Sequence, residues 1–253
     1  MGFLAQELPR SPALRTGQSN PRFEIGHSTS KMPSHTEENY LKAIYKLGEA
    51  EPGQDVSTNR IAAALTTRAA SVTDMLRRLS EKGLLDYERY RGVQLTAEGR
   101  RCALLTIRKH RLWEVFLVQQ LGFSWDEVHE VAEELEHVQS PLLMRRLDAF
   151  LGHPALDPHG DPIPAEDGAM QRPAHRLLAD LETGERGQLV AVKNTTAPFL
   201  QYLDKVGLQL GAQIVVLDKV AFDHSFELRI NEASTALISA EVSRNLYITR
   251  SGL

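Results

Sequence analysis

Apolar residues in the first third of the chain recur with the period of a helix. Those of residues 40–47 are three or four positions apart and predict a helix that ends at Gly48. A second short helix is predicted from residue 58, and a third over residues 68–82. Residues 84–96 then form two short β-type runs around a glycine-containing turn. Three helices followed by a hairpin are the order of a winged helix-turn-helix.

Three more helices are predicted after the hairpin. Thr96 caps the first of them, and its apolar stripe runs to Gly122. The second covers residues 124–138 and the third residues 140–151, where Pro141 occupies a first-turn position. The apolar residues expected on the inner face of the third helix are Leu142, Leu143, Leu147 and Phe150.

The pattern changes after residue 152. Residues 153–174 are rich in proline and contain Gly-Asp and Asp-Gly pairs, which is typical of a connecting segment. One helix, over residues 199–206, interrupts a series of short β-type runs. These runs are 187–192, 213–217, 226–230 and 235–238. Short runs between turns predict a small β-barrel of about 75 residues.

Composition narrows the possible functions. The single cysteine, Cys102, excludes an intrachain disulfide and a CxxC zinc or redox motif. No apolar run reaches the roughly 18 residues of a membrane-spanning helix, so we expect a cytoplasmic protein without a membrane partner. Residues 54–111 hold 12 Lys/Arg and 6 Asp/Glu, a net of +6, whereas residues 112–180 hold 4 and 13, a net of −9. The basic segment suits phosphates and the acidic one suits cations, but two solvated surfaces would have the same composition.

The acidic segment contains potential metal ligands at helical spacing. Four of them fall within an arc of about 100° on a helical wheel: His129, Glu133, Glu136 and His137. Residues 127–144 contain no Lys or Arg, and His110 and Glu114 form another pair at i and i+4 on the preceding helix. Imidazole and carboxylate without thiolate suit a borderline or hard divalent ion. A solvated acidic face has the same pattern, and spacing alone leaves both interpretations open.

Six motifs between residues 36 and 164 are ordered and spaced as in a known family. They are Tyr40-Leu41-Lys42-Ala43-Ile44-Tyr45, the helix 72–83, Arg89-Tyr90-Arg91-Gly92, Arg108-Lys109-His110-Arg111-Leu112, Glu136-His137-Val138 and Gly160-Asp161-Pro162-Ile163-Pro164. Through these motifs the chain resembles the metal-dependent repressors of the diphtheria toxin repressor and manganese transport regulator family. Residues 178–210 resemble, more loosely, the SH3-like iron-transport-associated domain that these regulators often carry.

The resemblance implies a mainly α fold in three parts. These are an N-terminal winged helix-turn-helix, a helical metal-binding and dimerisation domain, and a C-terminal small all-β SH3-like (FeoA-like) domain. The expected boundaries are 1–32 for a disordered tail, 33–100 for the winged-helix DNA-binding domain, 101–153 for the helical dimerisation and metal-binding domain, 154–174 for a linker and 175–253 for the SH3-like domain. Met32, just before the first helix, is an alternative natural start.

The resemblance also implies two metal sites per subunit. The primary site would be formed by Asn39, Glu133, Glu136 and His137, and the ancillary site by His110, Glu114 and His129. Glu133 stands where the iron-type members have a cysteine, and oxygen ligands with one imidazole favour Mn²⁺, with Fe²⁺ as the alternative.

The chain departs from the family at four of its metal-site positions. Asn39 is neutral, and Lys42 stands where some manganese regulators have a second glutamate of the first helix. Thr195 and Pro198 occupy the positions from which the toxin-repressor type draws further ancillary ligands. The ancillary site therefore needs water or another residue to complete it.

Operator DNA is the partner that the resemblance implies. The helix over residues 68–82 would enter the major groove, and arginines beside it would contact phosphates. The residues predicted to contact DNA are Thr67, Arg68, Ser71, Thr73, Asp74, Arg77, Arg78, Arg89 and Arg91. A homodimer through helices 124–138 and 140–151 would present two such helices to a palindrome.

We therefore expect a metal-activated, most simply Mn²⁺-responsive, repressor of metal-uptake genes. An enzyme is not expected, because the sequence contains no HExxH motif, nucleophile elbow or glycine-rich phosphate loop. One alternative is an Fe²⁺-responsive repressor of the same family. Another is a winged-helix regulator that is not gated by metal, whose acidic helix dimerises or binds an organic effector. The SH3-like part would either cover the helical core or bind another protein.

Overall fold

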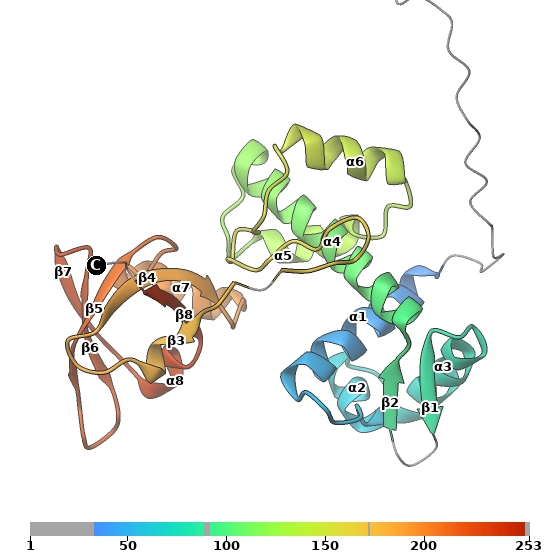
Figure 1. The fold of residues 1–253 in the computed structure, drawn as a ribbon, viewed down its shortest axis with the longest axis horizontal. Coiled ribbons are helices and arrows are strands. Elements are labelled where there is room, and N and C mark those ends of the chain that lie inside the picture. Colours follow the sequence, from blue (N-terminus) through green and yellow to red (C-terminus); the bar gives the residue numbers. More distant parts are fainter. Residues whose placement is uncertain (1–32, 89–91, 172, 251–253) are drawn as a thin grey trace, which may run out of the picture. The chain divides into compact units, whose positions relative to one another are not determined.

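A computed structural model describes residues 33–88, 92–171 and 173–250, so the predicted tail lies outside the described residues (Figure 1). The N-terminal elements are α1 (His35–Ala50), α2 (Thr58–Ala64), α3 (Ala69–Glu81), β1 (Leu85–Glu88) and β2 (Gly92–Leu95). Their apolar faces share one core with the first half of the next helix, and β1 pairs antiparallel with β2. The predicted winged helix-turn-helix is confirmed.

A left-handed residue forms the turn between α2 and α3. Thr66 has a φ of 48°, and its N–H donates to the carbonyl of Ala63 while the N–H of Thr67 donates to the carbonyl of Ala62. These two bonds are those of a Schellman C-cap, in which glycine is the usual left-handed residue. A β-branched side chain is strained in this conformation. Because Thr66 adopts this conformation despite the strain, the structure around the turn holds it there. The turn in this way fixes where α3 begins.

An ion pair joins the first turn of α1 to the end of α3. Glu37 belongs to the capping box of α1 and accepts a hydrogen bond from the Ser34 N–H. Lys82 Nζ lies 2.6 and 2.8 Å from the two carboxylate oxygens of Glu37. Burial alone would raise the pKa of Glu37, but the Lys82 ammonium and the Ser34 N–H together lower it below its usual 4.5. The orientation of α3 is thus tied to that of α1.

The helical part consists of α4 (Ala97–Leu121), α5 (Val128–Leu135) and α6 (Pro141–Phe150). α4 starts at the Thr96 cap and ends at Gly122, whose φ is 72°, and it packs against α1, α5 and α6. α5 is shorter than predicted, because residues 124–127 and 136–138 lie outside the helix, with residues 125–127 and 136–137 in turns. The expectation that four apolar residues of α6 face inward is wrong. Only Leu147 is buried, whereas Leu142, Leu143 and Phe150 are exposed because α6 packs mainly against α4.

The C-terminal part is an antiparallel sheet with short helices. Its elements are β3 (Arg176–Leu177), η1 (Leu178–Asp180), β4 (Arg186–Val192), α7 (Ala197–Val206), β5 (Gln213–Lys219), β6 (Phe226–Ile230), β7 (Ser234–Ile238), α8 (Ala240–Ser243) and β8 (Leu246–Arg250). The strand order is β3-β8-β4-β5-β6-β7. The four predicted β-type runs coincide with β4 to β7 and the predicted helix with α7, and their alternating apolar residues form a core of their own.

Replacing Thr66 by glycine is expected to stabilise the protein by about 0.5 kcal/mol. The substitution removes about 1–2 kcal/mol of left-handed strain and costs about 0.5–1 kcal/mol of backbone freedom. Urea unfolding monitored by circular dichroism measures the difference. Thr67→Gly, one residue along, is the control and should destabilise the protein. A Thr66→Gly variant less stable than the wild type would contradict the strain.

Glu37→Gln is expected to lower the free energy of unfolding by about 1 kcal/mol at pH 7. Because the folded-state pKa of Glu37 is depressed, its contribution is present above about pH 4.5 and is lost as the pH falls through the folded value. The difference between variant and wild type should therefore shrink towards zero near pH 3. Glu81→Gln, at an exposed position on α3, should show no such difference at either pH. A pH-independent difference would exclude the ion pair as its cause.

Candidate metal centre

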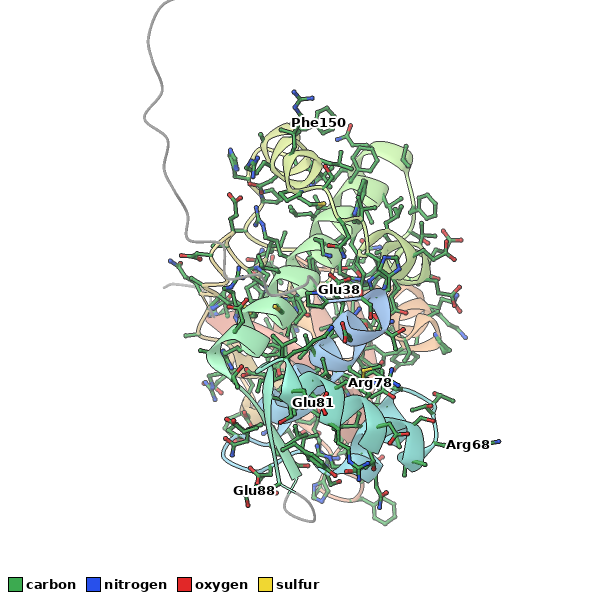
Figure 2. The ribbon with its side chains drawn as sticks, turned by 90° about the vertical axis from the view of Figure 1, so that its right-hand side faces the viewer. Glu38, Arg68, Arg78, Glu81, Glu88 and Phe150 are labelled. Carbon is green, nitrogen blue, oxygen red and sulfur yellow. The ribbon has the colours of Figure 1, made fainter. Side chains whose placement is uncertain are left out.

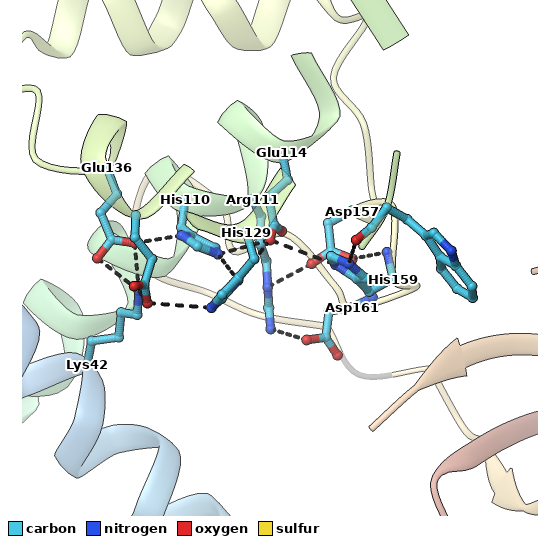
Figure 3. Close-up of polar contacts among 11 residues, drawn as sticks. Lys42, His110, Arg111, Glu114, His129, Glu136, Asp157, His159 and Asp161 are labelled. Carbon is cyan, nitrogen blue, oxygen red and sulfur yellow. Dashed lines mark hydrogen bonds and ion pairs between the residues drawn. The ribbon is translucent and has the colours of Figure 1, made fainter. Parts of the chain in front are cut away.

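Three imidazoles converge on one buried carboxylate, that of Glu114 on α4 (Figure 3). Glu114 Oε1 lies 3.0 Å from His110 Nε2 and 3.3 Å from His129 Nδ1. His159 Nδ1 is 3.8 Å from the same oxygen, and His110 Nε2 is 3.1 Å from His129 Nδ1. Four potential ligand atoms therefore face a common point.

Each imidazole comes from a different structural context. His110 and Glu114 lie one turn apart on α4, and His129 lies in the first turn of α5. His159 belongs to the connecting segment 153–174, which turns sharply at Gly160 (φ 87°). A side chain at position 160 would collide with the backbone of Val190 and Ala191. Glycine is required there for the segment to bring His159 to Glu114.

The outer nitrogens of the three imidazoles face acceptors. His159 Nε2 lies 2.8 Å from the carbonyl oxygen of Trp125 and donates its proton to it, and His159 Nδ1 faces Glu114. His129 Nε2 is 3.5 Å from Glu133 Oε1. His110 Nδ1 is 2.7 Å from Glu136 Oε2, although the angle is not that of a well-directed hydrogen bond. In metal-binding histidines, one ring nitrogen usually binds the ion through its lone pair and the other donates its N–H to an acceptor.

The charge of Glu114 is compensated by its neighbours. Burial alone would raise the pKa of Glu114, but the three imidazoles hold it well below its usual range. Hydrogen bonds to Glu114 and Glu133 raise the pKa of His129 to about 9. Burial lowers the pKa of His159, but Glu114, Asp157 and the Trp125 carbonyl together raise it above its usual value. Protons on His129 and His159 therefore balance the carboxylate, and a cation could replace them.

The donor set fits a divalent ion. Metal–ligand bonds of about 2.1 Å place neighbouring ligand atoms about 3.0–3.4 Å apart, close to the separations found among His110, Glu114 and His129. The ligand atoms of these three residues lie within 4.8 Å of one another. The same residues, with His159, line a cavity of about 30 Å³, which is room for one small occupant.

Asp157 forms a second group of possible ligands with Glu114 and His159. Its Oδ1 accepts the N–H groups of His159 at 2.8 Å and Asp161 at 3.0 Å, and Arg111 Nε lies 3.3 Å from its Oδ2. Burial, and then the charge of Glu114, raise the pKa of Asp157 to about 7. Asp157 thus shapes the loop that carries His159 and also borders the site.

The structure brings together all three residues of the predicted ancillary site and adds two that the sequence analysis missed. His159 faces the carboxylate of the predicted ancillary site, where a further residue was expected, and Asp157 lies beside it. Both lie next to the motif that begins at Gly160, but in a segment interpreted only as a connection. The sequence signal that could have identified both residues is the pair Asp157 and His159, which directly precedes that motif.

The four residues of the predicted primary site do not form a ligand cluster among the described residues. Asn39 is exposed on α1, and the Glu133 side chain is 52% exposed. Glu136 is buried because it continues the inward row of Val128 and Ala132. His137 lies in the turn after α5, where its Nδ1 is 2.7 Å from Glu38 Oε2. The family resemblance supplied Asn39, and the helical wheel that grouped Glu133, Glu136 and His137 assumed an unbroken helix through residue 137, whereas α5 ends at Leu135.

Most of the predicted DNA-contacting residues lie at the surface of α3 or the turn before it. Figure 2 shows Arg68 extending away from the fold and Arg78 further along the helix. The exposed members are Thr67, Arg68, Ser71, Asp74, Arg77 and Arg78. Thr73 is partly buried and donates to the carbonyl of Ala69, while Arg89 and Arg91 lie outside the described residues.

The chain matches three family models in succession. Residues 32–93 match the iron dependent repressor N-terminal DNA binding domain, residues 96–165 the iron dependent repressor metal binding and dimerisation domain, and residues 176–250 the FeoA domain. The diphtheria toxin repressor of Corynebacterium diphtheriae is 30% identical over 197 residues, which cover 73% of this chain and 85% of that protein. This chain belongs to the diphtheria toxin repressor family.

Two further members of the repressor family illustrate the range of similarity. The iron-dependent repressor IdeR of Mycobacterium tuberculosis is 40% identical over 129 residues, which cover 51% of this chain and 55% of that protein. The match thus spans about half the length of the mycobacterial relative. A solved manganese-dependent transcriptional repressor in complex with manganese is 36% identical with a TM-score of 0.78, over 85% of this chain and 100% of that chain. The family consists of transcriptional repressors, not of enzymes.

Among the residues that the structure describes, no helix has the length and apolar character needed to cross a membrane.

His159→Ala is expected to weaken Mn²⁺ binding by about tenfold or more, because it removes one of the converging nitrogens. Equilibrium dialysis with detection of free Mn²⁺ by electron paramagnetic resonance measures the affinity. His153→Ala is the matched control: this histidine lies in the same segment, but its side chain is 71% exposed and faces Asp148 instead of the site. Equal affinities of the His159→Ala variant and the wild type would exclude His159 as a ligand.

Proposed function

We propose that this protein is a metal-activated transcriptional repressor that responds to Mn²⁺ and binds a palindromic operator as a homodimer. The observation that carries the proposal is the convergence of three imidazoles on Glu114, each with its outer nitrogen near an acceptor. His110, Glu114, His129 and His159 would hold the ion, which supplies the positive charge that otherwise comes from protons. The described residues show no other arrangement of this kind apart from the group that Asp157 forms with Glu114 and His159.

A chain of contacts leads from the metal centre to the DNA-binding helix. His110 faces Glu114 through Nε2 and Glu136 through Nδ1, so binding at Nε2 would fix the proton on Nδ1 next to Glu136. Glu136 is ion-paired with Lys42 of α1. The first turn of α1 in turn holds Lys82 at the end of α3 through Glu37. Metal binding would thereby favour one orientation of α3 over others, which is all that a ligand needs to do to activate binding.

The choice of Mn²⁺ is supported by ligand chemistry and by similarity. The four residues supply imidazole and carboxylate without thiolate, which disfavours selection of soft ions. The manganese-bound repressor structure is similar over 85% of this chain. Fe²⁺ is the alternative, since the same donors bind it and the mycobacterial relative is an iron-dependent repressor. A repressor active only when metal-loaded would shut off metal-uptake genes when metal is sufficient.

The proposed dimer is supported by an apolar surface on the helical part. Leu142, Leu143 and Phe150 of α6 and Leu121 at the end of α4 are between 40% and 65% exposed. Apolar residues gathered on one element of a repressor are typical of a subunit interface. Residues 96–165 match a domain described as metal binding and dimerisation. Because the partner would be chromosomal DNA, we infer that the protein acts in the cytoplasm.

Operator binding is expected to require Mn²⁺ and to be lost when a chelator is added. The probe is a DNA duplex selected from a randomised palindromic library with the Mn²⁺-loaded protein, and fluorescence anisotropy measures the affinity. Glu114→Gln should lower the Mn²⁺-dependent gain in affinity by about tenfold or more, because it removes the central charge. Titrating Fe²⁺ under anaerobic conditions in the same buffer compares the two metals. DNA binding that is unchanged by the chelator would refute metal activation and favour the regulator without metal.

A further inference from the structure

The space between α1 and the end of α5 already holds a cation supplied by the chain. Lys42 Nζ lies 2.6 and 2.9 Å from the two carboxylate oxygens of Glu136 and 3.4 Å from Glu133 Oε1 (Figure 3). The side chains of Lys42 and Glu136 are 9% and 1% exposed. A buried ion pair of this kind persists because either charge without the other would be costly.

The residues around Lys42 are also paired within the chain. Glu38, one turn before Lys42, lies 2.7 Å from His137 Nδ1 and accepts a hydrogen bond from Lys109 Nζ at 2.9 Å. Asn39, the ligand that the family resemblance implied for α1, is exposed. The side of α1 that faces the end of α5 therefore presents one ammonium and one carboxylate, each with a partner of opposite charge or an imidazole.

These residues do not fit a divalent ion. Both oxygens of Glu136, the most buried carboxylate, face the Lys42 ammonium. An ion bonded to either oxygen at about 2.0–2.6 Å would lie close to that ammonium in a region where like charges repel strongly. Lys42, Lys46 and Arg111 also line the cavity at the Glu114 cluster, but the groups nearest to Glu114 Oε1 are imidazoles, whose nitrogens lie 3.0–3.8 Å away. The two places thus differ in the group next to the carboxylate, which is an ammonium without a lone pair at Glu136 and imidazoles that can bind a metal ion at Glu114.

We propose that Lys42 is the permanent cation between α1 and the end of α5. It joins these elements without metal, and each subunit takes up its ion only at the Glu114 cluster. This inference rests on the proposed function for that cluster and makes it more specific. The contacts that respond to metal are then those among α4, α5 and the segment that carries His159. The contact between α1 and Glu136 is present both with and without metal.

The number of Mn²⁺ ions bound per subunit tests the proposal. Equilibrium dialysis against Mn²⁺, followed by elemental analysis of full-length protein, should give about one ion for the wild type and for Lys42→Arg, which keeps the charge. Lys42→Glu should bind about two, because the lost ammonium is replaced by a further carboxylate at the same place. Circular dichroism and thermal unfolding establish that each variant is folded. Lys42→Met, which removes the charge but keeps a long apolar stem, is the second variant if Lys42→Glu does not fold.

His137→Gln locates the additional ion. In the wild type it should leave the count unchanged, and combined with Lys42→Glu it should return the count from about two to about one. A wild type that binds two ions, one of which is lost in His137→Gln, would overturn the proposal. So would folded Lys42→Glu and Lys42→Met proteins that bind no more Mn²⁺ than the wild type. A wild type that binds none would refute the proposed metal activation instead, and one extra ion in Lys42→Glu would still support the role of Lys42.

Discussion

A carboxylate buried inside a helical domain is the constraint on which the rest of the structure depends. Glu114 is 2% exposed, and an ionised carboxylate at that depth is stable only if positive charge or hydrogen-bond donors surround it. The chain meets this need with imidazoles from α4, from α5 and from the connecting segment. Side chains whose charge depends on a proton leave the balance adjustable. A lysine in their place would have fixed it.

α1 has a different role, because two of its three buried charged residues belong to lysine–glutamate pairs. Glu37 binds Lys82 of the DNA-binding part, Glu38 faces His137, and Lys42 faces Glu136. Three nearby positions of one helix therefore reach α3 on one side and the end of α5 on the other. A rigid helix with partners on two sides transmits a change in angle better than a flexible link would. His110 is the point where this fixed network meets the adjustable one, since it faces both Glu114 and Glu136.

Local patterns in the sequence predicted the elements well and their ends and partners less well. The winged helix and the strands β4 to β7 follow from apolar periodicity, which depends only on neighbouring residues. α5 ends at Leu135, so the helical wheel that grouped Glu133 with His137 extended two residues beyond the helix. His159 reaches the site through a loop, and periodicity says nothing about where a loop leads. The exposure of Phe150 depends on which face α6 turns towards α4, and periodicity does not specify that face.

The acidic residues of this segment fall into two groups in the structure. Glu130 and Glu134 are exposed on the outer face of α5 and form the solvated acidic surface that composition allowed. Glu114 and Glu136 are buried and each faces a histidine of the interior. Burial, not spacing, separates the two groups, since both recur at helical intervals. A run of acidic residues therefore predicts binding of a cation only for those members whose side chains the fold buries. In this chain those members are Glu114 on α4 and Glu136 at the end of α5.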